Sequence, residues 1–227
     1  MVFKREIELG GRTLSVEVGK VAKQSDGAAW VQYGDTVVLA AVNSRREVGN
    51  NTDFFPLTVD YRERKYAGGK IPGGFFKRES RPHDKETLIA RMIDRPLRPL
   101  FAKGYYHETQ ILLQVYSHDQ ENEGDVLAQI GATIALLTSD IPFETPVTSV
   151  RVGRIDGKFV INPTISQLEE SDLEILVAGT EDAIAMVEGE GKEISEEVFL
   201  EALDFAHTEI KRLVEFMKEF QAELGKP

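Results

Sequence analysis

The chain has 227 residues, no cysteine and a formal net charge of −11. The lack of cysteine excludes disulfides, thiolate metal sites and cysteine nucleophiles, and it fits a cytoplasmic protein. No apolar run is long enough to span a bilayer and no secretory signal begins the chain, so we expect no membrane association.

The start of the chain predicts two β-hairpins. Residues 2–9 alternate apolar and polar side chains, and Gly10-Gly11 separates them from residues 12–18. Residues 28–33 and 36–43 flank a Gly-Asp turn in the same way. We therefore expect four strands, paired as two hairpins.

The pattern changes after this point. Residues 37–42 are apolar without alternation, so we expect this stretch to be buried on both faces of a sheet. Residues 44–53 are polar, which predicts a loop, and residues 54–61 predict another strand.

Helices and strands alternate in the rest of the chain. Asp84 is a suitable cap for a helix that starts at Lys85, and Pro96 should end or kink that helix near Arg95. The other predicted elements are a strand at 110–117, a buried helix from Asp125 to Thr138, hairpins at 147–161 and 173–188, and a helix capped by Ser195. This order suggests two similar halves that meet near residue 105.

Residues 62–103 form a basic segment in an acidic protein. They contain 12 Lys or Arg and 5 Asp or Glu, a net charge of +7. The remainder carries −18, because the whole chain carries −11. Clustered cations pair with phosphates, so a polyanion is the simplest ligand for this segment.

The middle of the basic segment combines glycines with an aromatic and basic tip. Phe75 and Phe76 stand beside Lys77 and Arg78, a composition suited to stacking on unpaired bases. The alternative is an exposed loop whose two phenylalanines pack inward. Composition alone favours neither interpretation.

Arginines follow on the predicted helix. Arg91 and Arg95 are four residues apart and share a face, and Arg98 joins it if the helix continues. These side chains could contact RNA, or they could belong to a solvated face with ion pairs such as Asp94 to Arg98.

Acidic residues near the buried helix offer a second candidate site. Glu121, Glu123 and Asp125 could hold a cation, but solvated loop charges and a helix cap explain them more simply. The four histidines lack the spacing of metal ligands.

Several long motifs resemble bacterial polynucleotide phosphorylases. They read FFPLTV (54–59), IPGGFFKRE (71–79), ETLIARMIDRPLRPLF (86–101), SDIPF (139–143) and VAGTE (177–181). The resemblance implies an α/β (α+β) fold of the ribonuclease PH type, with two ββαβα-like halves, mixed sheets and a long C-terminal helix. It identifies residues 1–220 as the first of two such core domains, and 221–227 as the start of a linker to a helical domain.

The resemblance also implies an activity for the parent enzyme. Enzymes of this family form homotrimeric rings and degrade single-stranded RNA from its 3′ end, with phosphate as co-substrate and nucleoside diphosphates as products. The reaction is reversible, Mg²⁺ stabilises charge at the phosphate, and RNA degradosome components are possible partners.

The family's RNA-gripping loop is matched residue by residue. The resemblance assigns RNA contacts to Phe75, Phe76, Lys77, Arg78 and Arg81. Lys77 stands where many relatives have arginine, so it keeps the charge without the bidentate fork. On the helix, Arg91 and Arg95 are the weaker candidates for RNA contact.

The family's catalytic motifs are not matched. Where catalytic relatives carry a phosphate-binding loop, this chain has Glu123–Ala128, and residues 161–166 lack an aspartate pair. We therefore expect no catalytic or metal-binding residue here, with phosphate and Mg²⁺ acting in the second core domain. The alternatives are an autonomous ribonuclease-PH-like enzyme and a non-enzymatic ring subunit of the exosome type.

Overall fold

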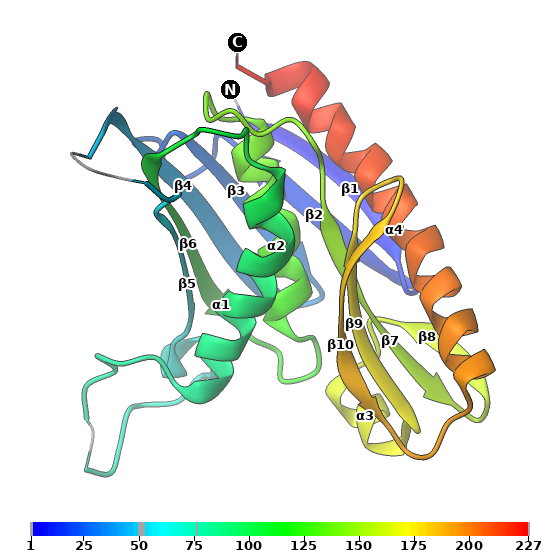
Figure 1. Ribbon diagram of the computed structural model, residues 1–227. Coiled ribbons are helices and arrows are strands. Elements are labelled where there is room, and N and C mark those ends of the chain that lie inside the picture. The colour runs from blue at the N-terminus through cyan, green and yellow to red at the C-terminus, as the bar shows by residue number, and fades with distance from the viewer. Residues whose placement is uncertain (1, 50–52, 76, 227) are drawn as a thin grey trace.

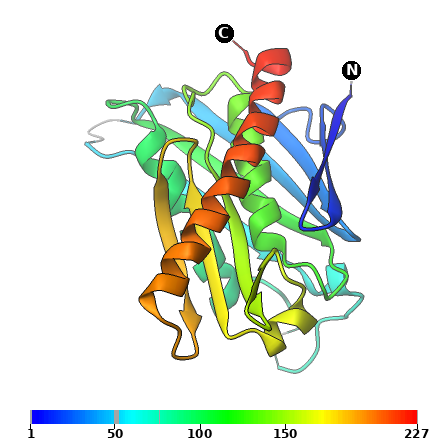
Figure 2. The same cartoon turned by 90° about the vertical axis from the view of Figure 1, so that its right-hand side faces the viewer.

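The computed structural model describes residues 2–49, 53–75 and 77–226. Helices α1 (Asp84–Leu97) and α2 (Gly124–Leu137) lie between two β-sheets (Figure 1). The long helix α4 (Glu196–Leu224) crosses the second sheet (Figure 2). The predicted combination of sheets, internal helices and a long C-terminal helix is confirmed.

The first sheet has six strands in the order β1-β2-β3-β4-β6-β5. Their bounds are β1 Phe3–Leu9, β2 Arg12–Val18, β3 Gly27–Tyr33, β4 Thr36–Val48, β5 Leu57–Glu63 and β6 His107–Ser117. Neighbouring strands are antiparallel except β5 and β6, which are parallel. Both predicted hairpins, β1–β2 and β3–β4, are therefore confirmed, and the sheet is mixed.

The second sheet has four strands in the order β10-β9-β7-β8. Its strands are β7 Thr148–Ile155, β8 Lys158–Ile161, β9 Leu173–Gly179 and β10 Ile184–Gly191, and a short helix, α3 (Ile165–Glu170), follows β8. Every pairing in this sheet is antiparallel.

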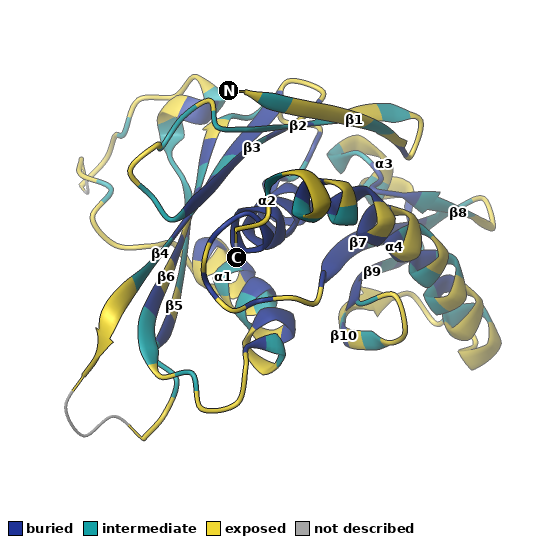
Figure 3. Ribbon diagram, turned by 90° about the horizontal axis from the view of Figure 1, so that it is seen from above, coloured by how far each residue is buried: buried dark blue, intermediate teal, exposed yellow. Residues whose placement is uncertain are grey.

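Helix α2 forms the centre of the molecule. Every residue from Gly124 to Leu137 is buried, as the dark ribbon in Figure 3 shows. At Gly131 an added Cβ would lie 2.9 Å from the Cβ of Ala40, so glycine lets the helix approach β4 closely. The prediction of a central, buried helix is confirmed.

Three boundaries predicted from the sequence are wrong. The 44–53 stretch is not all loop, because β4 runs to Val48 and pairs with β6 as far as Val48 and His107. The strand expected at 54–61 is β5, which covers Leu57–Glu63. The two halves meet after α2 rather than near residue 105. Strand β6, which follows residue 105, still belongs to the first sheet, where it lies between β4 and β5.

The stretch 37–42 is buried on one face rather than on both. Val38, Ala40 and Val42 are completely buried, whereas on the other face Val37 is 8% exposed and Leu39 and Ala41 are half-buried. Helix α2 packs against β3 and β4 from one side, and no described helix covers the other face. Because the side chains on both faces are apolar, the sequence shows no alternation of apolar and polar residues, although the two faces differ in burial.

Helix α4 is the last secondary-structure element of the described chain. It continues to Leu224, so four residues of the expected linker are helical, and Lys226 donates a hydrogen bond to the carbonyl oxygen of Asp26 at 2.5 Å. The domain boundary at residue 220 remains a prediction. Among the described residues, no helix combines the length and apolar composition that a membrane span requires.

Candidate nucleic-acid interface

The basic loop is tied down where it leaves and rejoins the body. The short 3₁₀ helix η1 (Lys65–Gly68) follows β5, and the backbone N–H of His118 donates to Ala67 O at 3.0 Å. Glu79 closes the loop from its far side, because its carboxylate accepts from Lys65 N at 2.9 Å and its carbonyl oxygen accepts from the Arg64 guanidinium. The loop between these anchors extends from the body (Figure 1).

Apolar side chains at the tip of this loop face solvent. Ile71 is 90% exposed and Phe75 is 94% exposed. The interpretation in which the phenylalanines pack inward is therefore wrong for Phe75, while Phe76 lies outside the described residues. An exposed ring next to cations matches what single-stranded nucleic acids bind.

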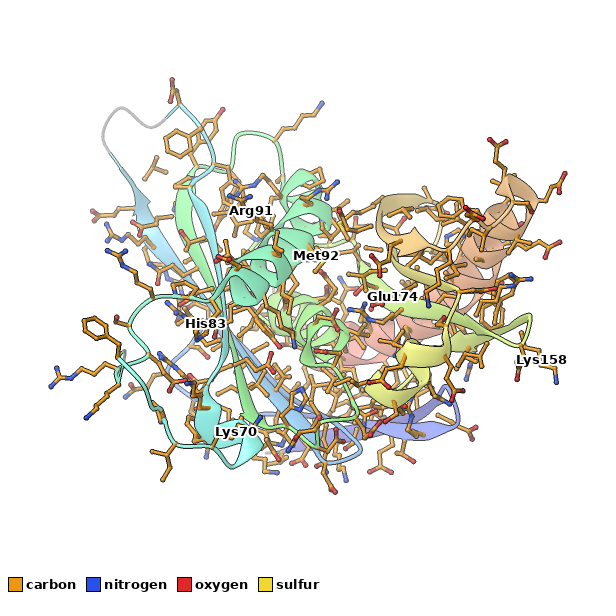
Figure 4. The ribbon with its side chains drawn as sticks, turned by 90° about the horizontal axis from the view of Figure 1, so that it is seen from below. Lys70, His83, Arg91, Met92, Lys158 and Glu174 are labelled. Carbon is orange, nitrogen blue, oxygen red and sulfur yellow. The ribbon has the colours of Figure 1, made fainter. Side chains whose placement is uncertain are left out.

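The loop's cations share this exposure. Lys70 (Figure 4), Lys77, Arg78 and Arg81 are all exposed. Flexible exposed cations can follow a phosphate backbone, and they attract it even though the chain as a whole is acidic.

Glu86 joins the loop to helix α1. This carboxylate is buried and accepts hydrogen bonds from His83 N at 2.6 Å and from Glu63 N at 2.7 Å. The helix accordingly begins at Asp84 with His83 as its N-cap, rather than at Lys85 with Asp84 as the cap. One buried side chain thus fixes the helix start against β5.

The three helix arginines have different environments. Arg91 is exposed and makes no ion pair or hydrogen bond with any described residue (Figure 4). Arg95 lies 2.7 Å from Glu188 across the gap to β10. Arg98 binds Asp94 through two hydrogen bonds, of 2.8 and 2.6 Å, and also donates to the carbonyl oxygens of Phe55 and Leu57. For Arg98 the alternative of an ion pair with Asp94 is therefore the one that the structure shows, and Arg98 is a structural residue.

We predict fast amide exchange in the loop without RNA. Residues 70–75 are exposed except for the half-buried Pro72, and Gly69 and Gly74 adopt the left-handed backbone conformation at φ 68° and 74°. In the full-length protein the amides of Ile71, Gly73, Gly74 and Phe75 should exchange at least tenfold faster than those of α2, by hydrogen-exchange mass spectrometry. Protection equal to that of α2 would contradict a loop open to RNA.

Three charged residues form a partly buried ion triad at the start of helix α2. The guanidinium of Arg151, on β7, contacts both Asp125 and Glu174. Burial lowers the pKa of Arg151, but the two carboxylates outweigh this effect and raise it. Asp125 also accepts from Val126 N at 2.7 Å, so this carboxylate already occupies the positive end of the helix.

The space beside this triad holds no ligand larger than water. The cavity lined by Asp125, Arg151 and Asn162 measures about 10 Å³, which is room for one water molecule. This volume is too small for a phosphate ion.

The three acidic residues considered as a cation site each bind a different partner. Glu121 accepts from the Ser166 hydroxyl at 2.6 Å, Glu123 lies 2.9 Å from Lys85, and Asp125 binds Arg151. No cluster of three or more potential metal ligands occurs in the described part of the chain.

Sequence reasoning missed the residues that connect this region. Arg12, on β2, donates to the Asn122 side chain and to the carbonyl oxygen of Asn162, and its guanidinium lies over the Tyr33 ring at 4.6 Å. The two asparagines are more than a hundred residues away in the sequence, and no local pattern indicates such a contact.

Asp119, in the loop that precedes α2, makes the stability of the protein depend on pH. Partial burial raises the pKa of Asp119, but hydrogen bonds from Asn122 and from the Glu121 N–H lower it more, to about 2. The usual value is 3.8, so the stabilising contribution is present above about pH 4 and is lost as pH falls towards 2.

We therefore expect Asp119→Ala to lower the free energy of unfolding by about 1 kcal/mol at pH 7, a value reduced for solvent screening. The difference from wild type should shrink between pH 4 and pH 2 in denaturant titrations. A difference that stays constant over this range would contradict the role of the carboxylate.

Together, these features define a mixed α/β core that presents a cationic, aromatic loop. At the N-terminus of α2, where an anion could bind, the Asp125 carboxylate already occupies the position. Models of the 3′ exoribonuclease family match residues 10–142 as domain 1 and residues 145–209 as domain 2. The chain belongs to the 3′ exoribonuclease family.

Curated relatives make the resemblance more specific. The chain is 56% identical over 220 residues to the polyribonucleotide nucleotidyltransferase of Geobacillus kaustophilus, covering 97% of this chain and 30% of that protein. It is 56% identical over 227 residues to the enzyme of the same name from Thermomicrobium roseum, covering 100% of this chain and 29% of that protein. The resemblance to polynucleotide phosphorylases is confirmed, and the chain spans about 30% of the length of these relatives.

Solved structures confirm the ribonuclease PH-type fold. A chain of the Archaeoglobus fulgidus exosome with RNA bound to the active site superposes with a TM-score of 0.70 at 16% identity, covering 90% of this chain and 88% of that chain. Rice Rrp46 superposes with a TM-score of 0.74 at 17% identity, covering 95% of this chain and 96% of that chain. At these identities the likeness concerns the fold alone.

Proposed function

We propose that this chain is the RNA-guiding core domain of a phosphorolytic 3′ exoribonuclease. The parent enzyme would convert RNA and phosphate into nucleoside diphosphates and would run the reverse polymerisation. The observation that carries the proposal is the exposed basic loop, with Phe75 beside Lys77, Arg78 and Arg81, on a protein of net charge −11. Its anchored base and solvated tip suit a guide for single-stranded RNA.

The RNA-contacting set would also include Phe76 and Arg91. Arg91 is exposed on the helix that follows the loop, so it extends the cationic surface. Arg95 would join this cationic surface once its ion pair with Glu188 is broken. That pair is exposed, so breaking it costs little free energy.

The chemistry would belong to another part of the full-length protein. Here Asp125 and Glu174 neutralise Arg151, and the cavity beside them is too small for phosphate. Phosphate and Mg²⁺ would therefore act in a second core domain, and this chain would supply neither a catalytic residue nor a metal ligand.

The proposal extends to the assembly. The full-length protein would form a homotrimer in the cytoplasm, with possible contacts to RNA degradosome components. Occurrence of the same fold in an archaeal exosome supports a role as a building block of such an assembly.

The test is a phosphorolysis assay on the isolated chain. Incubated with poly(A), phosphate and Mg²⁺, it should release no ADP above background, because α2 offers no phosphate site. The full-length enzyme is the positive control. ADP release that co-purifies with the isolated chain would instead support the autonomous ribonuclease-PH-like enzyme.

A further inference from the structure

Strand β10 is an open edge of the second sheet. It pairs with β9 on one side, and no strand of the described chain pairs with its other side. Residues 188–191 are exposed. An exposed edge of this kind can hydrogen-bond to another extended chain.

One face beside this edge carries a groove with an apolar part. A groove of about 550 Å³ lies beside Val187 and Gly189, on the side facing the start of α4. Its apolar lining consists of Leu173, Ile175, Val187, Ile194 and Phe199, and the glutamates Glu188, Glu190 and Glu193 also line it. This groove fits branched apolar side chains.

The opposite face is acidic. Glu190 pairs across the strands with Glu174, and Glu188 lies on the same face because strand residues alternate. These glutamates line a second groove, of about 240 Å³, together with Met92 of α1 (Figure 4) and with Arg151, which already pairs with Glu174 and leaves Glu190 without a cation from this groove. Arg95 already approaches Glu188 at 2.7 Å, which shows that this face accepts a cationic side chain.

We propose that β10 binds an extended protein segment that alternates apolar and basic residues. Added as a strand along this edge, such a segment would place every second side chain in the apolar groove and the others against the glutamates. A second copy of this chain is a poor occupant, because pairing β10 with β10 would bring Glu188 and Glu190 against identical charges. RNA is excluded by the same negative charge.

The probe is a fluorescent peptide of about six residues, the usual strand length, that alternates lysine and valine. Its control is a block isomer with the same composition but with the lysines and valines separated. Binding to the full-length protein is followed by fluorescence anisotropy, and the binding position by hydrogen exchange. The alternating peptide should bind more tightly than its isomer and should slow exchange of the β10 amides.

Glu190→Lys tests the acidic face, and its matched control is Glu223→Lys at the far end of α4, which makes the same change in net charge. Glu190→Lys should weaken binding by about fivefold, as expected for replacing an attraction with a repulsion at a solvated pair, while Glu223→Lys should not. Thermal midpoints of both variants are measured to confirm folding.

Equal binding of the two peptides, equal weakening by the two variants, or no protection of β10 would overturn the proposal. In each case the peptide would be held by non-specific charge attraction.

Discussion

Replacing Arg151 by alanine should lower the free energy of unfolding by about 3–5 kcal/mol, because removal of one member of a buried ion group leaves uncompensated charge behind. Asp125 is 4% exposed and Glu174 is 30% exposed, so water screens the first of these carboxylates very little. Urea unfolding of wild type and variant measures the difference.

Arg154→Ala is the matched control for this prediction. Arg154 lies on the same strand and pairs with Asp172 at 2.8 Å, but both members of this pair are more exposed, at 24% and 41%. Removing this guanidinium should cost no more than about 1 kcal/mol. Equal destabilisation by the two substitutions would contradict a special role for the triad at α2.

Phe75→Ala should weaken RNA binding by the full-length enzyme by about 1–3 kcal/mol, the contribution of one base stacked on an aromatic ring. The effect should be similar for poly(A) and poly(U), because every base offers a π-face. Affinities are measured by equilibrium titration in the absence of phosphate.

Ile71→Ala is the control, because Ile71 is 90% exposed on the same loop but has no ring to stack. It should leave affinity nearly unchanged. If the two substitutions have equal effects, or if Phe75→Ala acts on one homopolymer alone, stacking is not how the loop binds RNA.

Much of the fold could be predicted because its signals are local. The Gly10-Gly11 turn and the apolar helix 125–138 each occupy a short stretch whose periodicity determines the element. The order of strands in the first sheet could not be predicted, because β6 inserts between β4 and β5 through pairings distant in sequence. The extension of β4 to Val48 has the same cause, since β6 stabilises polar residues that would otherwise form a loop.

In the candidate site, too, local features could be predicted from the sequence and contacts between distant residues could not. The cationic and aromatic character of the loop is visible in the composition of a few consecutive residues, and the structure places Phe75 in solvent. The Arg151 triad and the Arg95–Glu188 pair join residues that lie far apart in the chain, so charge counting could not find them. The first contact identifies Arg151 as a largely buried structural cation, whereas Arg95 stays exposed in its ion pair.

The most direct test of the account is the salt dependence of RNA binding by the full-length enzyme with Lys77→Ala and Arg78→Ala combined. The log–log slope of affinity against salt should flatten by about 0.7 for each phosphate of single-stranded RNA that the variant no longer neutralises. Lys158→Ala with Lys211→Ala, which removes the same charge from exposed positions outside the basic segment, should keep the wild-type slope. Wild-type affinity and slope in the loop variant would show that the loop does not guide RNA.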